Sequence, residues 1–510
     1  MAEEEYRQVR LQKRQQLEAE GVHPHPERFE RTHTLAEAMR LPEGTRVKVA
    51  GRMVQMRDMG KLTFASLQDL AGALQISLTR DGLDPDPEKS KASYKRFTKQ
   101  LDRWDFVGVE GELFRTQKGE LTVRVAAWTF LGKALQPPPG KFHGLTDTEI
   151  SWRKRYVDLV SNQETRERFR LRTRVARALR EYLDQNGFEE VETPILCNQA
   201  SGALARPFLS HHNSLDMPVV LRIAPETYLK RLVVGGYDRV YEMARCFRNE
   251  GMDPSHLQDF TMLEFYAAYW NYEDNMRFTQ ALVCHVVQAA TGSLTVKRGE
   301  RTIDFGGEWP RKSLRDVILE HAGIDIDRHE DAASLKAAIL ARKVELENPD
   351  AGRGSLIDQL YKRTARPKLI QPTFIIKHPI DLSPLARRND QDPKVADRFQ
   401  LVVDTWEVVN AYSELVDPID QRGRLEEQAR LRGKGDDEAM EMDEDYLSSM
   451  EYGMPPISGW GMGIDRFVAL ITDVPNLRDV VWFPLLKPID GAAAAAAAPE
   501  GAPAAAHEKP

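Results

Sequence analysis

The sequence predicts an α+β protein with two or three domains. Its 510 residues are too many for one ordinary hydrophobic core. Between Arg46 and Leu131, short segments of alternating apolar and polar residues are separated by glycines, which is typical of a small β-barrel. Residues 241–266 then read as a strand, a loop and a returning strand, after a long helix-forming stretch at 163–186.

The composition excludes several classes of protein. A hydrophobic content of 41% and a charged content of 29% are those of a soluble globular protein. No apolar run is as long as a membrane helix needs and the first residues lack the apolar core of a signal peptide, so we expect neither membrane insertion nor secretion. Cys197, Cys246 and Cys284 form no CxxC pair, which favours a reducing cytoplasm and no structural zinc. A net charge of −7 confines any nucleic-acid contact to a local basic patch.

Residues 1–45 are expected to form a helical arm. Glu3–Glu20 is rich in helix formers and free of Gly and Pro, and Gly21 provides a stop signal. The apolar residues of this stretch make only a weak stripe, which favours a solvated arm over a helix that contacts nucleic acid. The barrel follows at 46–135, and its expected strands are Val47–Val54, Leu62–Gln68, Leu74–Leu78, Phe106–Phe114 and Leu121–Phe130.

The remaining domain boundaries follow from breaks in composition. Pro137–Gly144 is a stiff, proline-rich segment, so we place a linker at 136–150. The second domain then covers 151–490 and contains an insertion of short helices at 309–369. From 491 to 510 the chain is rich in Ala and Pro without an apolar period, and we expect this tail to be disordered.

The strand pair at 241–266 carries the clearest sign of a functional site. With the two-residue period of a strand, Arg248 and Glu250 share one face, as do Phe260, Glu264 and Tyr266 on the return. The opposite face is apolar. Charged side chains on a half-buried face are costly to desolvate unless something occupies them. We therefore expect the polar face to bind a ligand.

A glycine-spaced segment at Gly459–Arg466 supports a phosphate-bearing ligand. Its glycines alternate along an expected strand that leads into an apolar helix at 467–471, and they let a ligand approach the backbone closely. Alone, such a run of glycines usually marks only a tight turn. Together with Arg248, however, Arg466 supplies two guanidinium groups for a polyphosphate.

Several segments, in one order, resemble the class II aminoacyl-tRNA synthetases. Motifs 1 to 3 of that family are matched by Arg155–Leu159 with Gly187–Pro194, by Phe247–Glu264 and by Pro455–Arg466. The segments similar to the lysyl enzymes of subclass IIb are Ser201–Phe208, Arg222–Glu226 and Asn410–Leu415. The resemblance covers nearly the whole chain, from about Arg46 to Pro488.

This resemblance implies the fold, the activity and the partners. The barrel would be an OB-fold that reads an anticodon, and the second domain a catalytic domain built on an antiparallel sheet flanked by helices. The implied activity is that of a cytoplasmic lysine–tRNA ligase, a homodimer that uses lysine, ATP and tRNA(Lys), with Mg²⁺ as cofactor.

The expected ATP contacts follow from the chemistry of amino-acid activation. Negative charge accumulates at the α-phosphate as pyrophosphate leaves, so cations and positioning carry most of the catalysis. By the family resemblance, Arg248 contacts the α-phosphate and the attacking carboxylate, Arg466 contacts the γ-phosphate, and Phe260 stacks on adenine. These two arginines are the expected catalytic residues. The other expected ATP contacts are Glu250, His256 and Glu407, the last of which would also bind Mg²⁺.

The expected amino-acid pocket is acidic. Several convergent carboxylates suit a substrate with two ammonium groups. By resemblance, Glu226 holds the α-ammonium, whereas Glu264 and Glu414 hold the ε-ammonium. The remaining expected contacts of lysine are Gly202, Tyr266, Asn410 and Tyr412.

Three alternatives remain at this point. The three carboxylates disfavour an aspartate or asparagine ligase, and an aspartate pocket would instead need an Arg or Lys aimed at the substrate side chain. A non-catalytic tRNA-binding paralogue is disfavoured because both arginines and the glutamates at 264 and 407 are present. In its known examples, a ligase that modifies a protein lysine lacks the barrel.

The expected anticodon contacts lie in the barrel. Phe64 can stack on an unpaired base, Arg57 can pair with a phosphate or a base edge, and Gln75 and Glu120 can read Watson–Crick groups. Taken singly, these residues are better explained as a core phenylalanine and ordinary surface polar groups. The match of residues 59–64 and 119–121 to the family reverses that preference.

The chain departs from the family pattern in three places. The motif 2 loop reads His-Leu-Gln-Asp-Phe at His256–Phe260 instead of His-Asn-Pro-Glu-Phe, and Val409–Tyr412 replaces Gly-Asn-Gly-Phe. Gln400 stands where the family has a metal-binding glutamate, opposite Glu407 across a hairpin turn expected at Asp404–Thr405. An amide oxygen is a weaker Mg²⁺ ligand than a carboxylate, so the metal site should depend on Glu407 and on ATP.

Overall fold

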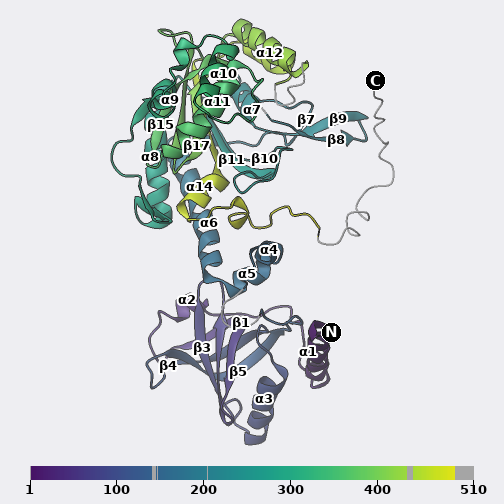
Figure 1. The fold of residues 1–510 in the computed structure, drawn as a ribbon. Helices are drawn as coiled ribbons and strands as arrows, with labels where there is room; N and C mark the ends of the chain where they lie inside the picture. Colours follow the sequence, from purple (N-terminus) through teal and green to yellow (C-terminus); the bar gives the residue numbers. More distant parts are fainter. Residues whose placement is uncertain (1, 140–144, 146, 204, 434–439, 489–510) are drawn as a thin grey trace. The chain divides into compact units, whose positions relative to one another are not determined.

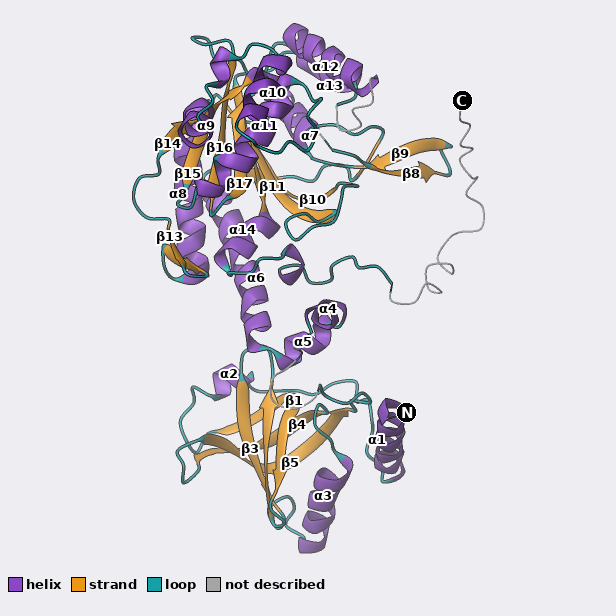
Figure 2. Ribbon diagram, in the orientation of Figure 1, coloured by secondary structure: helices purple, strands orange, loops and turns teal. Residues whose placement is uncertain are grey.

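The computed structural model describes residues 2–139, 145, 147–203, 205–433 and 440–488 (Figures 1 and 2). The chain divides into two compact units, residues 1–146 and 147–510. Most of the expected Pro137–Gly144 hinge and the whole Ala/Pro tail lie outside the described residues. No helix in the described ranges is long and apolar enough to cross a membrane.

The first unit is a closed five-stranded barrel. Its strands follow the order β1-β2-β3-β5-β4, and the one parallel pair, β3 with β5, closes the barrel with the antiparallel pair of β1 and β4. All five strands predicted from the sequence are present, because alternate side chains along them are buried. Their bounds are β1 (Arg46–Asp58), β2 (Leu62–Gln68), β3 (Ala73–Thr79), β4 (Phe106–Arg115) and β5 (Leu121–Gly132).

One helix of this unit, α3 (Pro87–Gln100), was not predicted. Asp86 caps its first turn and Pro87 occupies its first position, both standard helix-start signals. Only Tyr94 and Phe97 anchor its apolar side, so the hydrophobic period is too sparse to read. Phe97 packs edge-to-face on Trp128, with 5.4 Å between ring centroids.

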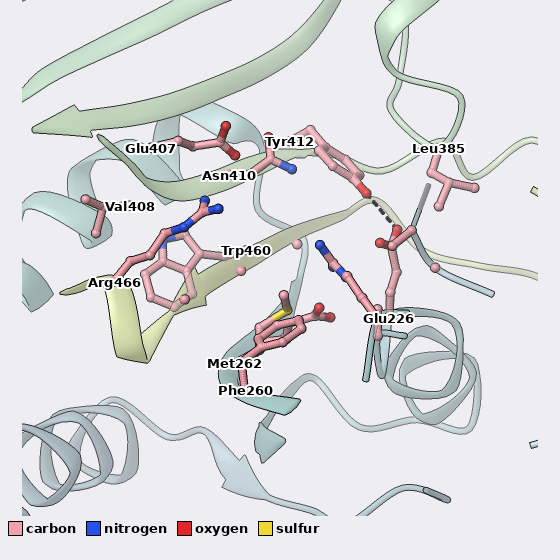
Figure 3. Close-up of a pocket in the computed structure, with 18 of the residues that line it drawn as sticks. Glu226, Phe260, Met262, Leu385, Glu407, Val408, Asn410, Tyr412, Trp460 and Arg466 are labelled. Atoms are coloured by element: carbon pink, nitrogen blue, oxygen red, sulfur yellow. Dashed lines mark hydrogen bonds between the residues drawn. The ribbon is translucent and has the colours of Figure 1, made fainter. Parts of the chain in front are cut away.

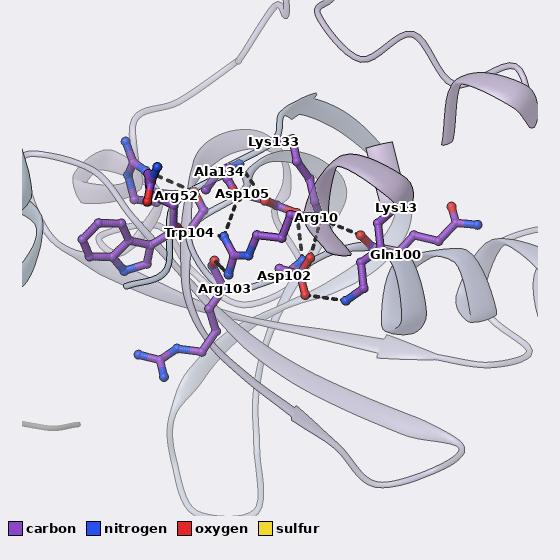
Figure 4. A network of polar contacts seen from close by, with 11 residues as sticks. Arg10, Lys13, Arg52, Gln100, Asp102, Arg103, Trp104, Asp105, Lys133 and Ala134 are labelled. Atoms are coloured by element: carbon purple, nitrogen blue, oxygen red, sulfur yellow. Dashed lines mark hydrogen bonds and ion pairs between the residues drawn. The ribbon is translucent and has the colours of Figure 1, made fainter. Parts of the chain in front are cut away.

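The N-terminal helix α1 (Ala2–Ala19) corrects the expectation of a solvated arm. Leu17 is completely buried in the core of the barrel unit, and Arg10 is only 2% exposed. The Arg10 guanidinium donates to the backbone carbonyls of Arg103, Ala134 and Gln136 (Figure 4). The apolar pattern of the sequence did not predict this docking, because the helix is attached partly by an arginine that donates to main-chain carbonyls and not by apolar residues alone.

A buried lysine holds together the same corner of the barrel. Lys133 Nζ lies 2.6 Å from Asp102 and 2.9 Å from Asp105, and Lys13 of α1 also binds Asp102 at 2.6 Å (Figure 4). Lys133 and Asp105 are almost fully excluded from solvent. Burial raises the pKa of Asp105 in spite of the neighbouring Lys133 ammonium. Removing either charge would therefore leave the other one buried without its partner, which destabilises the fold.

The second unit is built on an eight-stranded sheet in the order β14-β15-β16-β17-β18-β11-β10-β6. The pairs from β15 to β10 are antiparallel, as expected, whereas the two short edge strands pair in parallel. The sheet strands are β6 (Glu189–Glu190), β10 (Arg239–Phe247), β11 (Asp259–Ala268), β14 (Arg311–Ser313), β15 (Thr373–Pro379), β16 (Val395–Val403), β17 (Trp406–Ser413) and β18 (Ile457–Gly463). The smaller strands are β7 (Leu196–Cys197), β8 (Phe208–His212), β9 (Met217–Leu221), β12 (Thr295–Arg298) and β13 (Arg301–Asp304).

Helices pack on both faces of this sheet (Figure 2), and α6 (Gln163–Gln185), α8 (Tyr272–Thr291) and α14 (Ile464–Ile471) form the main core with one of them. Phe265 of β11 stacks on Trp460 of β18 at 4.8 Å, and both pack against α6, α8 and α14. The expected insertion at 309–369 contains α9, α10 and α11 with a separate apolar core, and its first residues form β14. The helices of the unit are α4 (Thr148–Arg153), α5 (Arg155–Ser161), α6 (Gln163–Gln185), α7 (Glu226–Val234), α8 (Tyr272–Thr291), α9 (Leu314–Ala322), α10 (Ala332–Ala341), α11 (Arg353–Thr364), α12 (Pro418–Gly433), α13 (Glu444–Glu451) and α14 (Ile464–Ile471).

Replacing Lys133 with Met should destabilise the barrel unit strongly. The substitution keeps most of the aliphatic stem but leaves Asp105 as a buried charge without its cation, which costs about 3–5 kcal/mol. Urea denaturation of the full chain, followed by tryptophan fluorescence, measures the change in the free energy of unfolding. Lys89→Met, on the exposed side of α3, is the matched control. A loss below about 1 kcal/mol for Lys133→Met would contradict the assigned ion pair.

Candidate active site

The face of the sheet opposite the main core forms one pocket of about 320 Å³ (Figure 3). Every residue that the sequence assigned to ATP or to the amino acid lines this pocket. They are Gly202, Glu226, Arg248, Glu250, His256, Phe260, Glu264, Tyr266, Glu407, Asn410, Tyr412, Glu414 and Arg466.

A row of glycines forms the floor of the pocket. In the strand register, Gly459 lies between Tyr266 and Tyr412, and Gly461 lies between Glu264 and Asn410. A Cβ atom at Gly459 would overlap the Glu414 carboxylate and the Tyr266 ring. Glycine is therefore required at this position, because the side chains of the flanking strands close over the main chain of β18.

The two expected catalytic arginines reach the pocket from different elements. The Arg248 guanidinium lies 5.1 Å from the centroid of the Phe260 ring, a cation–π distance. Arg466 is in the first turn of α14, and its Nε lies 3.4 Å from the carbonyl oxygen of Ser255 in the loop between β10 and β11. Burial lowers the pKa of Arg466, but a guanidinium stays charged.

Asp465 fixes the position of Arg466. One of its carboxylate oxygens accepts from the backbone N–H of Thr261 at 2.8 Å, and the other binds Arg172 of α6 at 2.6 Å. The start of α14 is thereby tied to β11 and to α6. Neither Arg172 nor Asp465 was predicted as a site residue, because the two lie on different helices that are distant in sequence.

The loop between β10 and β11 is held by its own side chains. His256 Nδ1 lies 2.6 Å from Asp253, and Gln258 donates to the carbonyl of Gly251 at 3.2 Å. The backbone N–H of Arg248 donates to the carbonyl of Gln258 at 2.9 Å, which closes the base of the loop. Gln258, one of the departures from the family motif, thus takes part in the loop structure.

Three glutamates converge at the other end of the pocket. Glu226, Glu264 and Glu414 are all at most 6% exposed. Tyr412 donates its hydroxyl to Glu226 at 2.7 Å (Figure 3), and Tyr266 donates to Glu264 at 3.2 Å. Burial raises the pKa of Glu264 to about 8, with the charge of Glu226 as the second cause. Burial likewise raises the pKa of Glu414, although an adjacent lysine opposes the shift.

That lysine, Lys230 of α7, was missed by the sequence analysis. It is completely buried, with Nζ 2.7 Å from Glu226 and in direct contact with Glu414. The available signal was its spacing, because a lysine four residues after Glu226 on a helix lies on the same face. Glu414, distant in sequence, gave no such signal.

Glu407 and Gln400 face each other across the turn at Asp404–Thr405. Both turn residues have positive φ angles, 44° and 69°, as a tight two-residue hairpin requires. Gln400 Nε2 donates to Glu407 at 3.0 Å, so the amide nitrogen rather than the amide oxygen faces the carboxylate. In the described part of the chain, no group of three or more His, Cys, Asp or Glu side chains is arranged for a metal ion.

The four residues expected to contact an anticodon lie in the first unit. Arg57 of β1 pairs with Phe64 of β2 in the strand register, and the Phe64 side chain is only half-buried, on the outer face of the barrel. Gln75 of β3 donates to Thr122 of β5 at 2.8 Å, and Glu120 is exposed two residues before Thr122. Phe64 is therefore not a fully buried core residue.

Comparison with known families decides the relationship. A family model described as class II tRNA synthetases (D, K and N) matches residues 147–487, the greater part of the chain. The chain belongs to the class II tRNA synthetases. A second model, described as an OB-fold nucleic acid binding domain, matches residues 47–131 of the barrel. The resemblance and the fold class predicted from the motifs are thus confirmed.

Curated relatives within the class II tRNA synthetases are similar over nearly their full length. The lysine–tRNA ligase of Carboxydothermus hydrogenoformans is 46% identical over 486 residues, which cover 94% of this chain and 98% of that protein. The lysine–tRNA ligase of Pelotomaculum thermopropionicum is 44% identical, over 95% of each chain. That of Bacillus cytotoxicus is 42% identical, over 94% of this chain and 96% of that protein.

The raised pKa of Glu264 predicts a pH-dependent stability of the ligand-free protein. An unfolded glutamate ionises near pH 4.5, whereas Glu264 in the folded chain ionises near pH 8. Between these values the folded state holds a proton that the unfolded state has lost. The contribution of Glu264 therefore decreases with rising pH, by at most about 1.4 kcal/mol per pH unit.

Glu264→Gln should remove this decrease. Urea denaturation at pH 5, 6.5 and 8 without ligands measures it, and Glu345→Gln on the exposed insertion is the control. Parallel stability profiles for wild type and Glu264→Gln would mean that Glu264 is already ionised in the folded pocket.

Proposed function

We propose that this chain is a lysine–tRNA ligase. It activates lysine with ATP to lysyl-adenylate and transfers the lysyl group to the 3′ end of tRNA(Lys), releasing AMP and pyrophosphate. The observation that carries this assignment is the convergence of three buried glutamates and two arginines in one pocket. Relatives named as lysine–tRNA ligases, similar over nearly the whole chain, support it.

In the activation step a carboxylate oxygen of lysine attacks the α-phosphorus of ATP. A new O–P bond forms as the P–O bond to pyrophosphate breaks in line with it. Arg248 is suited to neutralise the α-phosphate and to orient the attacking carboxylate, and Arg466 to hold the γ-phosphate. Phe260, against which Arg248 packs, offers a face for adenine, with Glu250 and His256 beside it in the loop between β10 and β11.

The acidic end of the pocket is suited to the two ammonium groups of lysine. Glu226 would hold the α-ammonium, whereas Glu264 and Glu414 would hold the ε-ammonium with help from Tyr266. Gly202 has a φ of 86° and lies against Glu226, so its main chain can border the substrate closely. The remaining contacts we assign to lysine are Asn410 and Tyr412.

An aspartate or asparagine ligase fits this pocket less well. An aspartate ligase needs a cation directed at the substrate side chain, and neither substrate has a second ammonium group to match the three carboxylates. Arg398 donates to Asn410 at 2.8 Å and to the Leu382 carbonyl, and Lys230 is bound by Glu226 and Glu414. Both cations are thus occupied by groups of the chain itself.

Mg²⁺ would be held by Glu407 together with the phosphates of ATP. Magnesium in ATP-dependent enzymes commonly has one or two carboxylate ligands and takes the rest of its shell from phosphates and water. Glu407 lines the pocket and fits this role, whereas Gln400 presents its amide nitrogen to Glu407. When bound, the ion would neutralise charge on the triphosphate.

We assign the barrel to the tRNA anticodon, with Phe64 stacking on a base and Arg57, Gln75 and Glu120 around it.

We also propose a cytoplasmic homodimer. Its support is a group of exposed apolar side chains beside motif 1: Tyr156 is 62% exposed and Phe483 is 71% exposed, on segments joined by a bond from Arg155 to the Trp482 carbonyl.

Replacing Arg248 with Ala tests the function directly. Adenylate formation, measured as ATP–pyrophosphate exchange with each of the twenty amino acids, should depend on lysine in the wild type. The variant should lose about 10²-fold or more of this activity while it stays folded, because a preorganised cation is removed. Arg363→Ala, at an exposed ion pair of the insertion, should retain the activity. Exchange that does not require lysine would refute the assignment.

Gln400→Glu tests the metal assignment. The substitution places a second carboxylate beside Glu407, so the pair repels in the absence of a cation and binds Mg²⁺ more tightly in its presence. The Mg²⁺ concentration for half-maximal exchange should fall, and the Tm of the nucleotide-free variant should rise more steeply with Mg²⁺ than that of the wild type. Glu407→Gln should raise the Mg²⁺ requirement steeply. An unchanged Mg²⁺ response in Gln400→Glu would put residue 400 outside the metal shell.

A further inference from the structure

Lys230 is the one cation of the described chain whose ammonium is buried between two carboxylates of the pocket. Its side chain is 0% exposed, Nζ lies 2.7 Å from Glu226, and it is in contact with Glu414. Removing a lysine ammonium from water is costly, and such a group is kept only where partners compensate it. The surroundings of residue 230 therefore stabilise a charged side chain and not an apolar one.

Three tyrosine rings surround Lys230, and two of them, Tyr266 and Tyr412, line the same pocket. Its Nζ lies 5.9 Å from the centroid of Tyr266, 5.7 Å from that of Tyr412 and 5.7 Å from that of Tyr446. Tyr266 donates to Glu264, and Tyr412 donates to Glu226. The three rings come from β11, β17 and α13, so Lys230 lies where three elements meet at the acidic end of the pocket.

The charges at this end do not balance without Lys230. Three carboxylates, of Glu226, Glu264 and Glu414, face two ammonium groups of a free lysine. Three buried carboxylates so close together cannot all stay ionised unless a cation compensates them. With the Lys230 ammonium present, the net charge of the group matches the two positive charges of the substrate.

We propose that Lys230 is a specificity-determining positioning residue, a fixed counter-ion that keeps Glu226 and Glu414 ionised and oriented for the two ammonium groups of lysine. It does not contact the reacting atoms. It acts through the carboxylates that bind the substrate, and so it sets how well the pocket separates lysine from an amino acid of the same length without the ε-ammonium. This inference rests on the assignment of the pocket to lysine.

Lys230→Met keeps most of the aliphatic stem of the side chain and removes the charge. The carboxylates should then take up a proton that lysine has to displace. At pH 7 the KM for lysine should rise at least tenfold and the preference for lysine over norleucine should fall by a similar factor, while the KM for ATP changes less than twofold. Toward pH 9 the KM for lysine should approach the wild-type value, because the carboxylates ionise again.

The groups that titrate around Lys230 are Glu226, Glu264, Glu414, Tyr266, Tyr412 and Tyr446. A purely structural lysine would lower Tm and kcat without changing how the KM for lysine depends on pH. That outcome, or an unchanged KM for lysine, would overturn the proposal. Lys336→Met, at an exposed ion pair of α10, is the matched control.

A measurement on the wild type tests the proposal even if the Lys230→Met variant does not fold. Calorimetric titration of lysine at pH 7 in two buffers of different ionisation enthalpy counts the protons released on binding. Burial raises the pKa of both Glu264 and Glu414. If Lys230 holds Glu414 ionised in the free protein, the wild type should release no more than about one proton, that of Glu264, whereas a protonated Glu414 would add a second. Release of two or more would overturn the proposal. Exchange activity without a requirement for lysine would instead refute the function proposed for the pocket. The role of Lys230 as a counter-ion would then be decided by the number of protons released in the calorimetric titration.

Discussion

The pocket depends on the close approach of side chains to the main chain of β18. Tyr266 and Glu264 on one neighbouring strand and Tyr412 and Asn410 on the other flank a strand that has glycines at 459 and 461. A sheet face that carried side chains on all three strands would be filled. With glycines in the middle strand, it becomes a trough whose walls are polar and whose floor is backbone. Both arginines and all three glutamates are arranged along this trough.

The two ends of the trough carry charges of opposite sign. At one end Arg248 and Arg466 present cations near Glu407, as a triphosphate requires. At the other end the buried carboxylates create a region that attracts ammonium groups. The substrate carboxylate and the α-phosphate have to meet between these ends. A sheet is a suitable support, because strand register fixes the spacing of the groups without any loop having to close.

Much of this arrangement could be predicted from the sequence, and the failures have physical causes. The two-residue period identified the polar face of β11, and all thirteen pocket residues assigned by motif lie together. The placement of Arg248 and Glu250 on the outgoing strand was wrong, because β10 ends at Phe247 and both residues lie in the following loop. Lys230 was missed because its spacing from Glu226 is common on solvent-exposed helices and its other partner, Glu414, is distant in sequence. The helix α3 and the docking of α1 were missed because each depends on a few anchors, such as Phe97 and Arg10, rather than on an apolar period. The parallel edge strands were too short to carry a pattern.

The docking of α1 has a practical consequence for work with the protein. The Arg10 guanidinium bonds to main-chain carbonyls at 103, 134 and 136, and Leu17 completes the barrel core. A recombinant form that starts after this helix would leave those carbonyls without their donor and open an apolar gap beside α3. The Arg10 guanidinium also lies 5.0 Å from the centroid of the Tyr6 ring. An affinity tag fused directly before Tyr6 would therefore lie next to this contact. The helix is best treated as part of the barrel unit when expression boundaries are chosen.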